Sequence, residues 1–152
     1  MEQLTRNTIW FESPSIRMSA WRDFRKNLDN TSIPDMCATV VDWWATAPTM
    51  AITIDPVDST NWPTAWELLN YGEYCNHSIA LGMAYTIFYV NPDIPNKIVY
   101  LTDRTNSVEA LCVVIDDKYL LNYEYGTVHT IPSGVEVSFT QIIDDLVKNR
   151  KT

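Results

Sequence analysis

The sequence has few cysteines, few basic residues and no long apolar run, and each shortage excludes a class of protein. Its three cysteines are an odd number without Cys-x-x-Cys spacing, which argues against a disulfide framework and a structural zinc site. Eleven Lys and Arg residues against nineteen Asp and Glu leave a net charge of −8, which disfavours nucleic acid as a partner. Because its apolar runs are far shorter than the roughly 18 residues that span a bilayer, we expect no membrane insertion.

The remaining composition is that of a globular protein. The 152 residues are 46% hydrophobic and 12% aromatic, and no repeat or long linker divides them. We therefore expect an N-terminal arm, residues 1–13, and a single domain, residues 14–152. No signal-peptide pattern opens the sequence, so a reducing cytoplasm is the expected setting.

The first half of the sequence has helical periodicity. Apolar residues recur at spacings of three and four after Ser13-Pro14, and a second apolar stripe runs from Pro34 to before Pro48. A two-turn helix should begin at Trp62 and end near Gly72. The longest predicted helix covers residues 75–90.

The second half is rich in β-forming residues. Three strands are predicted at residues 97–102, 108–115 and 118–125, with a hairpin turn at Asp116-Asp117. Residues 135–137 should add an edge strand, and Ser138 with Gln141 forms a capping-box pattern for a last helix. The predicted fold class is α+β, with helices packed on a small antiparallel sheet.

Cys75 is the main candidate for chemistry because it should begin a buried helix. The amide groups at a helix N-terminus stabilise a thiolate and lower the pKa of the thiol. The alternative is that Cys75 fills space between helix and sheet, since reduced cysteine is among the most buried residue types. We expect Cys37 and Cys112 to be core residues.

Three segments together resemble a known family. They are Trp62-Pro-Thr-Ala-Trp-Glu-Leu-Leu, Gly72-Glu-Tyr-Cys-Asn-His-Ser-Ile-Ala and Glu109-Ala-Leu-Cys-Val-Val-Ile-Asp-Asp-Lys-Tyr-Leu-Leu-Asn. Over residues 62–122 the sequence is similar to the core of transglutaminase-like, papain-like cysteine peptidases. In that family a Cys at a helix start is followed by His on one strand and Asp on the next.

The resemblance implies that Cys75 matches the nucleophile, Glu109 the catalytic His and Asn122 the orienting Asp. A general base must become a cation beside the thiolate, and a carboxylate cannot do so. Glu109 would instead raise the pKa of the thiol by like-charge repulsion. We therefore expect a vestigial triad, with Glu109 and Asn122 on adjacent strands, paired directly or one step apart, facing the Cys75 helix.

The chain has two histidines that could replace the missing base. His77 lies two positions after Cys75, about 200° around the helix, and should not reach the thiol. His129 lies beyond the hairpin and would need an unusual connection to form a dyad. We expect neither histidine to bind a metal, and no cofactor is implied.

Ile9, Trp10 and Phe11 form an aperiodic apolar cluster in the predicted arm. Aromatic anchors are enriched at the centres of protein interfaces, so we expect this cluster to dock on another chain. The pair Trp43-Trp44 is a second candidate surface.

The sequence as a whole resembles small proteins of contractile-tailed bacteriophages. This implies a non-catalytic structural or assembly component of the virion, made in the host cytoplasm and bound to other phage proteins. The alternative is a cysteine hydrolase or acyltransferase that uses Cys75. The sequence leaves the identity of the partner and the oligomeric state open.

Overall fold

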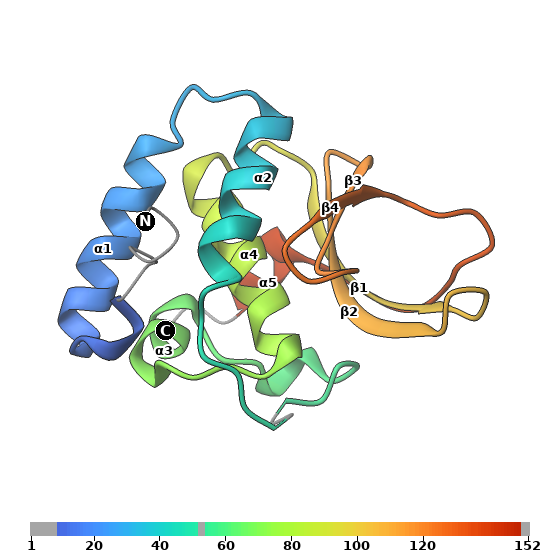
Figure 1. The fold of residues 1–152 in the computed structure, drawn as a ribbon, viewed down its shortest axis with the longest axis horizontal. Coiled ribbons are helices and arrows are strands. Elements are labelled where there is room, and N and C mark those ends of the chain that lie inside the picture. The colour runs from blue at the N-terminus through green and yellow to red at the C-terminus, as the bar shows by residue number, and fades with distance from the viewer. Residues whose placement is uncertain (1–8, 52–53, 150–152) are drawn as a thin grey trace, which may run out of the picture.

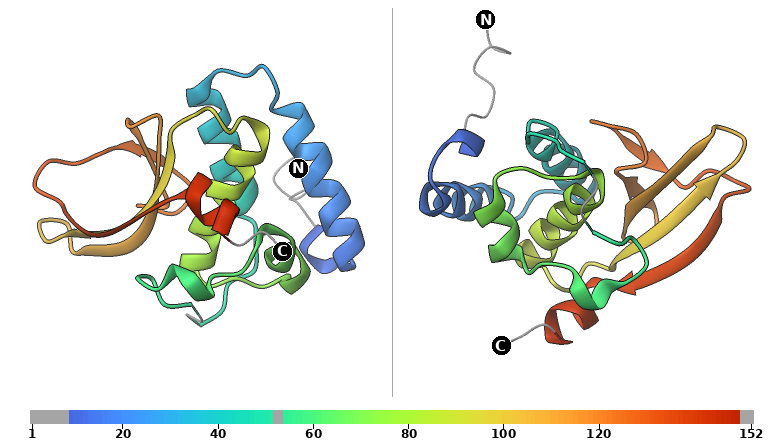
Figure 2. Two further views of the ribbon diagram at one scale, coloured as in Figure 1. Left: turned by 180° about the vertical axis from the view of Figure 1, so that it is seen from behind. Right: turned by 90° about the horizontal axis from the view of Figure 1, so that it is seen from below.

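The computed structural model describes residues 9–51 and 54–149. In these residues five α-helices pack on one five-stranded antiparallel sheet, as shown in Figure 1. Figure 2 shows that α4 lies between α1 and the sheet. The α+β class expected from the sequence is therefore confirmed. Within these residues, no helix combines the length and apolar character that crossing a membrane would need.

The first three helices begin and end at the signals that the sequence carries. Helix α1 (Pro14–Asn27) is capped by the Ser13 hydroxyl, and α2 (Ile33–Trp44) by Ser32. Helix α3 (Ala65–Tyr71) has a capping box between Thr64 and Glu67, and ends at Gly72 in the left-handed conformation. Helix α3 starts three residues later than predicted because Pro63 and Thr64 precede its first turn.

Helix α4 (Asn76–Val90) is the centre of the domain. Every residue from His77 to Ile87 is buried, so the helix is covered on all sides rather than along one stripe. The indoles of Trp21 and Trp44 both donate to the Thr86 hydroxyl, each at 3.0 Å. These two hydrogen bonds tie α1 and α2 to α4 and satisfy the polar atoms of three buried side chains.

The sheet has the order β4-β3-β2-β1-β5 and is antiparallel throughout. The strands are β1 (Asn96–Asp103), β2 (Val108–Ile115), β3 (Tyr119–Leu121), β4 (Val128–Thr130) and β5 (Glu136–Ile142). Asp116 and Asp117 both have positive φ, 59° and 56°, which confirms the predicted hairpin turn.

Both faces of the sheet bury apolar side chains. Ile98, Leu111, Val113 and Leu121 belong to the main core against the helices. The opposite face carries a second cluster, the far-face core: Val99, Leu101, Ala110, Cys112, Val114 and Leu120. Strands buried on both faces explain the continuous apolar run in β2.

Two predictions near the C-terminus are wrong. The capping box at Ser138 and Gln141 does not exist, because both residues lie in β5, where Gln141 is paired with Ile98 of β1. The last helix, α5 (Ile143–Asn149), starts only after this strand. Strand β3 is also shorter than predicted, since Asn122 has a φ of 70° and ends it, and β4 was not predicted.

The described part of the N-terminal arm packs on the domain's own core. Residues Ile9–Phe11 form a 3₁₀ turn in which Trp10 is only 3% exposed. The Trp10 ring lies 4.9 Å from Trp43 and 5.3 Å from Tyr74, and its indole donates to Thr46. The expected docking of Trp10 on another chain is therefore wrong.

Arg17 explains why the arm folds back. Its guanidinium is buried and donates to the backbone carbonyls of Trp10, Glu12, Leu69 and Asn70. One side chain thus joins the arm to α1 and α3. Ile9 also packs on the core, whereas Phe11 is 79% exposed.

Candidate functional site

Cys75 lies at the start of α4, between the helix and a backbone bridge formed by the preceding residue. It is the N-cap residue, and its thiol makes no capping hydrogen bond to the helix. The preceding residue, Tyr74, forms a parallel bridge with Thr49; its N–H donates to the Pro48 carbonyl, and its carbonyl accepts from the Met50 N–H. The Cys75 side chain is 0% exposed, so a reagent or substrate has no direct path to the sulfur.

Asn122 lies against the first residue of α4. Its amide nitrogen donates to the carbonyl of Asn76 at 3.1 Å and to the carbonyl of Leu111 at 3.0 Å. Asn122 is 5% exposed, and its positive φ turns the chain out of β3. The side chain therefore links α4 to β2 one residue after Cys75.

Glu109 occupies β2 opposite Thr102 of β1 and is exposed. It lies in the same alternating set as Leu111 and Val113, which face the helices. Burial raises the pKa of Tyr100, and the charge and hydrogen bond of Glu109 raise it further. The carboxylate of Glu109, near the hairpin turn that joins β1 and β2, is thus associated with Tyr100 of β1.

The expected pairing of Glu109 with Asn122 is wrong. Val113 pairs with Leu121, so the same register sets Asn122 opposite Cys112, three residues from Glu109. Even a two-residue turn at Asp116-Asp117 would set Asn122 opposite Leu111, two residues from Glu109, and the loop residue Lys118 moves Asn122 one residue further. Asn122 instead donates to the backbone carbonyl of Leu111, a β2 residue whose side chain belongs to the main core.

His129 lies on β4 opposite Leu120, whose side chain belongs to the far-face core. Its Nε2 is 2.9 Å from the Glu124 carboxylate, and its ring packs on Tyr123. Because the sheet separates this face from α4, a Cys75–His129 dyad does not form.

His77 is buried in the first turn of α4. Its Nδ1 is 3.2 Å from the carbonyl oxygen of Ile54, and its ring lies edge-on to Tyr100 at 6.2 Å. A carbonyl oxygen only accepts, so Nδ1 carries a proton in this contact. These contacts fix the ring between a loop and β1.

The other two thiols belong to the cores. Burial raises the pKa of Cys37 to about 12 and that of Cys112 to about 12, and none of the three cysteines forms a disulfide. Among the described residues, no group of three or more His, Cys, Asp or Glu side chains could hold a metal ion.

No model of a protein family and no curated protein sequence matches the chain. Solved structures of LapG from Legionella pneumophila do match its fold. The calcium-bound form has a TM-score of 0.70 at 12% identity, over 89% of this chain and 90% of that chain. A second LapG structure has a TM-score of 0.70 at 12% identity, and an EGTA-treated form 0.65 at 13%, each over 91% of this chain and 90% of that one. The fold is transglutaminase-like. In this fold, the described site combines a buried thiol at a helix start with the Asn122 amide, which donates to the backbone carbonyls of Asn76 and Leu111.

Proposed function

We propose that this chain is a non-catalytic interaction domain, a structural or assembly component of a tailed bacteriophage particle. In this proposal it is made in the host cytoplasm, acts in the virion and binds other phage proteins. The transglutaminase-like fold is retained as a scaffold, because function resides in sites and a fold persists without its original chemistry.

The observation that carries the proposal is that the amide of Asn122 binds Leu111 of β2 and, among the described residues, no histidine. An orienting amide at this place would hold an imidazole that accepts the thiol proton, as in Cys-His-Asn arrangements. Instead, the amide of Asn122 binds the backbone of Leu111 and of Asn76. Its role is therefore to fasten α4 to the sheet.

The exposed carboxylate of Glu109 does not replace the base. A carboxylate that accepts a proton becomes neutral, so it cannot provide the positive charge that stabilises a thiolate. Glu109 interacts instead with Tyr100. Glu109 is therefore better explained as an exposed polar residue at the protein surface than as a group that transfers the thiol proton.

The phage assignment is supported by the sequence resemblance and by an acidic composition with a rich aromatic content. An exposed aromatic such as Phe11, at 79%, or Trp66, at 49%, offers the kind of anchor that protein interfaces use.

The second candidate function is a cysteine hydrolase or acyltransferase. The position of Cys75 at the start of α4 favours it, and the transglutaminase-like fold is compatible with it. In this case access to the sulfur would require a local opening of the structure, since Cys75 is 0% exposed.

Replacement of Cys75 in the phage genome separates the two functions. A Cys75→Ala strain should produce particles at the wild-type yield, with the chain detected in purified virions by mass spectrometry. The matched control is Cys112→Ala, which removes an equally buried thiol on the sheet face opposite α4. Loss of infectivity in Cys75→Ala but not in Cys112→Ala, with both chains folded, would favour the enzyme.

A further inference from the structure

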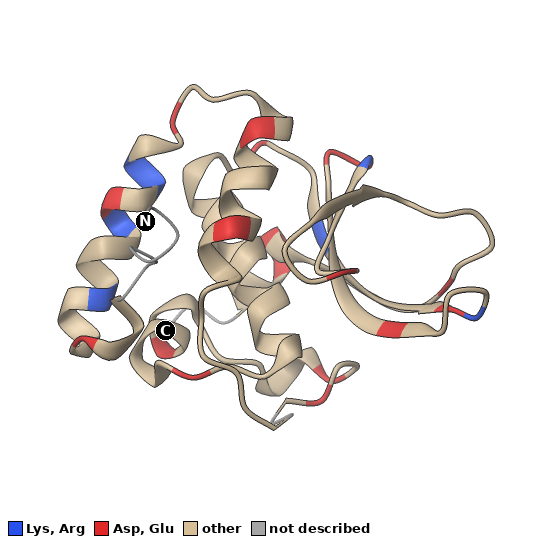
Figure 3. Cartoon of the chain, viewed as in Figure 1, with Lys and Arg blue, Asp and Glu red and all other residues tan. Residues whose placement is uncertain are grey.

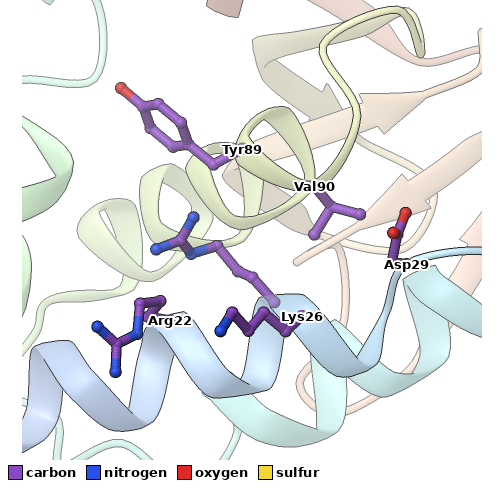
Figure 4. A pocket seen from close by; sticks show the side chains of 6 residues that line it. Arg22, Lys26, Asp29, Tyr89 and Val90 are labelled. Carbon is purple, nitrogen blue, oxygen red and sulfur yellow. The ribbon is translucent and has the colours of Figure 1, made fainter.

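The basic residues of this acidic chain are concentrated on one helix. Four of its eleven Lys and Arg residues lie on α1, visible as the blue bands in Figure 3. Three of them, Arg22, Arg25 and Lys26, line one cavity of about 290 Å³. Tyr89 and Val90 of α4 form its other wall, as shown in Figure 4.

Arg25 is the fixed element of this pocket. Its guanidinium carbon lies 4.1 Å above the Trp21 ring and 5.8 Å from the Tyr89 ring, which are cation–π distances. Its buried Nε has no hydrogen-bond acceptor among the described residues. A half-buried guanidinium held on aromatic faces keeps its donors oriented before a ligand arrives.

The charge of the pocket is not balanced locally. Among the described residues, only Arg22 of these three cations forms an ion pair. Its partner is Asp23 at 3.6 Å, and both side chains are exposed. Burial lowers the pKa of Arg25, Tyr89 raises it, and the charge of Arg22 lowers it. Asp29 also lines the pocket but lies beside Val90, at the end away from Arg22 (Figure 4).

An exposed aromatic residue stands next to the pocket. Trp66 of α3 packs edge-on against Tyr89 at 5.2 Å and against Trp21 at 5.9 Å, and remains 49% exposed. An apolar surface thus continues directly from the cationic pocket.

We propose that this pocket binds a glutamate or aspartate side chain from an acidic segment of a partner protein, while Trp66 contacts an apolar neighbour in that segment. The guanidinium of Arg25 can form paired hydrogen bonds with a carboxylate, and Arg22 and Lys26 add two positive charges beside it. The cavity is smaller than most pockets that hold drug-sized ligands, so it suits one or two side chains. The identity of the partner as a protein rests on the proposed interaction role, whereas the ligand chemistry rests on the pocket alone.

Nuclear magnetic resonance of the ¹⁵N-labelled full chain tests the proposal. The probe is the peptide acetyl-Gly-Phe-Glu-Glu-Gly-amide, and its matched control has Gln in place of each Glu. The buried Nε–H of Arg25 should give a resolved signal, since burial slows its exchange with water. We expect the Glu peptide to shift this signal and the amides of α1 saturably, and the Gln peptide to leave them unchanged.

Two double variants locate the binding. Arg22→Gln/Lys26→Gln should weaken binding of the Glu peptide by about tenfold, whereas Arg104→Gln/Lys118→Gln, at exposed residues in two hairpin turns of the sheet, should leave it unchanged. Equal shifts from the two peptides, or equal loss in the two variants, would overturn the proposal. Tighter binding of tripolyphosphate than of the Glu peptide would overturn it as well. None of these results depends on Cys75, so they are distinct from a failure of the non-catalytic assignment.

Discussion

The amide nitrogen of Asn122 donates to the backbone carbonyl of Asn76 at 3.1 Å, one residue after the buried Cys75. The same nitrogen donates to Leu111 of β2 at 3.0 Å. A position that resembles the orienting residue of a catalytic triad therefore serves as a structural clamp between helix and sheet.

This clamp should contribute measurably to stability. Asn122→Gly keeps the positive φ but removes the donor to the buried carbonyl of Leu111 and to the carbonyl of Asn76, so the free energy of unfolding should fall by about 2 kcal/mol. Asn122→Ala should cost about 1 kcal/mol more, since Ala is strained at positive φ. Urea unfolding measures both.

Asn30 supplies the matched control for this clamp. It has the same φ of 70° but is exposed, so Asn30→Gly should change stability by less than about 0.5 kcal/mol. Equal effects at the two positions would show that the amide of Asn122 does not hold α4 to the sheet.

Gly82 should not tolerate a methyl group. A Cβ at this position would lie 2.5 Å from two ring carbons of Trp44, and the indole is fixed by its hydrogen bond to Thr86. Gly82→Ala should therefore lower the free energy of unfolding by about 2 kcal/mol or more. Helix propensity alone predicts that Gly82→Ala raises the free energy of unfolding by up to about 1 kcal/mol. Thermal unfolding therefore distinguishes the two expectations by the sign of the change in stability.

The arm should behave as part of the domain. Trp10→Ala removes a buried indole from a cluster with Trp43, Trp44 and Tyr74 and should cost about 3 to 5 kcal/mol. Phe11→Ala, one residue later and exposed, should change stability by less than about 0.5 kcal/mol. If urea unfolding shows a similarly small loss of stability in both variants, the arm is not part of the domain core and would again be a candidate docking segment.

Asp103 should make stability depend on acid pH. Its carboxylate accepts from the Tyr123 hydroxyl at 2.5 Å and from Asn106 at 2.9 Å, and these bonds hold the pKa of Asp103 below its ordinary value. A depressed folded-state pKa stabilises the fold above the ordinary carboxyl pKa, and the contribution disappears as the pH falls through the folded value.

Tyr123→Phe removes the first of these bonds. The variant should be less stable than the wild type at about pH 7, and the difference should shrink as the pH is lowered through the carboxyl range. Tyr71→Phe, at an exposed site on α3, is the control. A wild-type-to-variant difference that is constant with pH would show that the hydroxyl does not act through the Asp103 charge.

The predictable parts of the fold were those encoded by local signals. The hairpin at Asp116-Asp117 and the start of α4 at Cys75 follow from turn propensity and from apolar spacing. The edge strand predicted at residues 135–137 is the start of β5, but the rest of this strand was missed because Ser138 and Gln141 match a helix cap locally, and only pairing with β1 decides against it.

The site was harder to predict because its decisive contacts are distant in the sequence. The sequence resemblance singled out Cys75, Glu109 and Asn122. It could not predict the register of β3 against β2, which sets Asn122 three residues away from Glu109. The burial of Trp10 likewise depends on its contacts with Trp43 and Tyr74, more than 30 residues away. Aperiodic segments carry no pattern from which such contacts can be read.

The reactivity of Cys75 toward iodoacetamide tests the non-catalytic assignment most directly. The native chain is treated at about pH 6.5 and alkylation is located by peptide mass spectrometry, with Cys37 and Cys112 as buried internal references. We predict that Cys75 reacts no faster than free cysteine and that its alkylation accelerates only as urea unfolds the chain. Rapid alkylation of the native protein at one thiol, lost in Cys75→Ala, would contradict the account and identify an activated nucleophile.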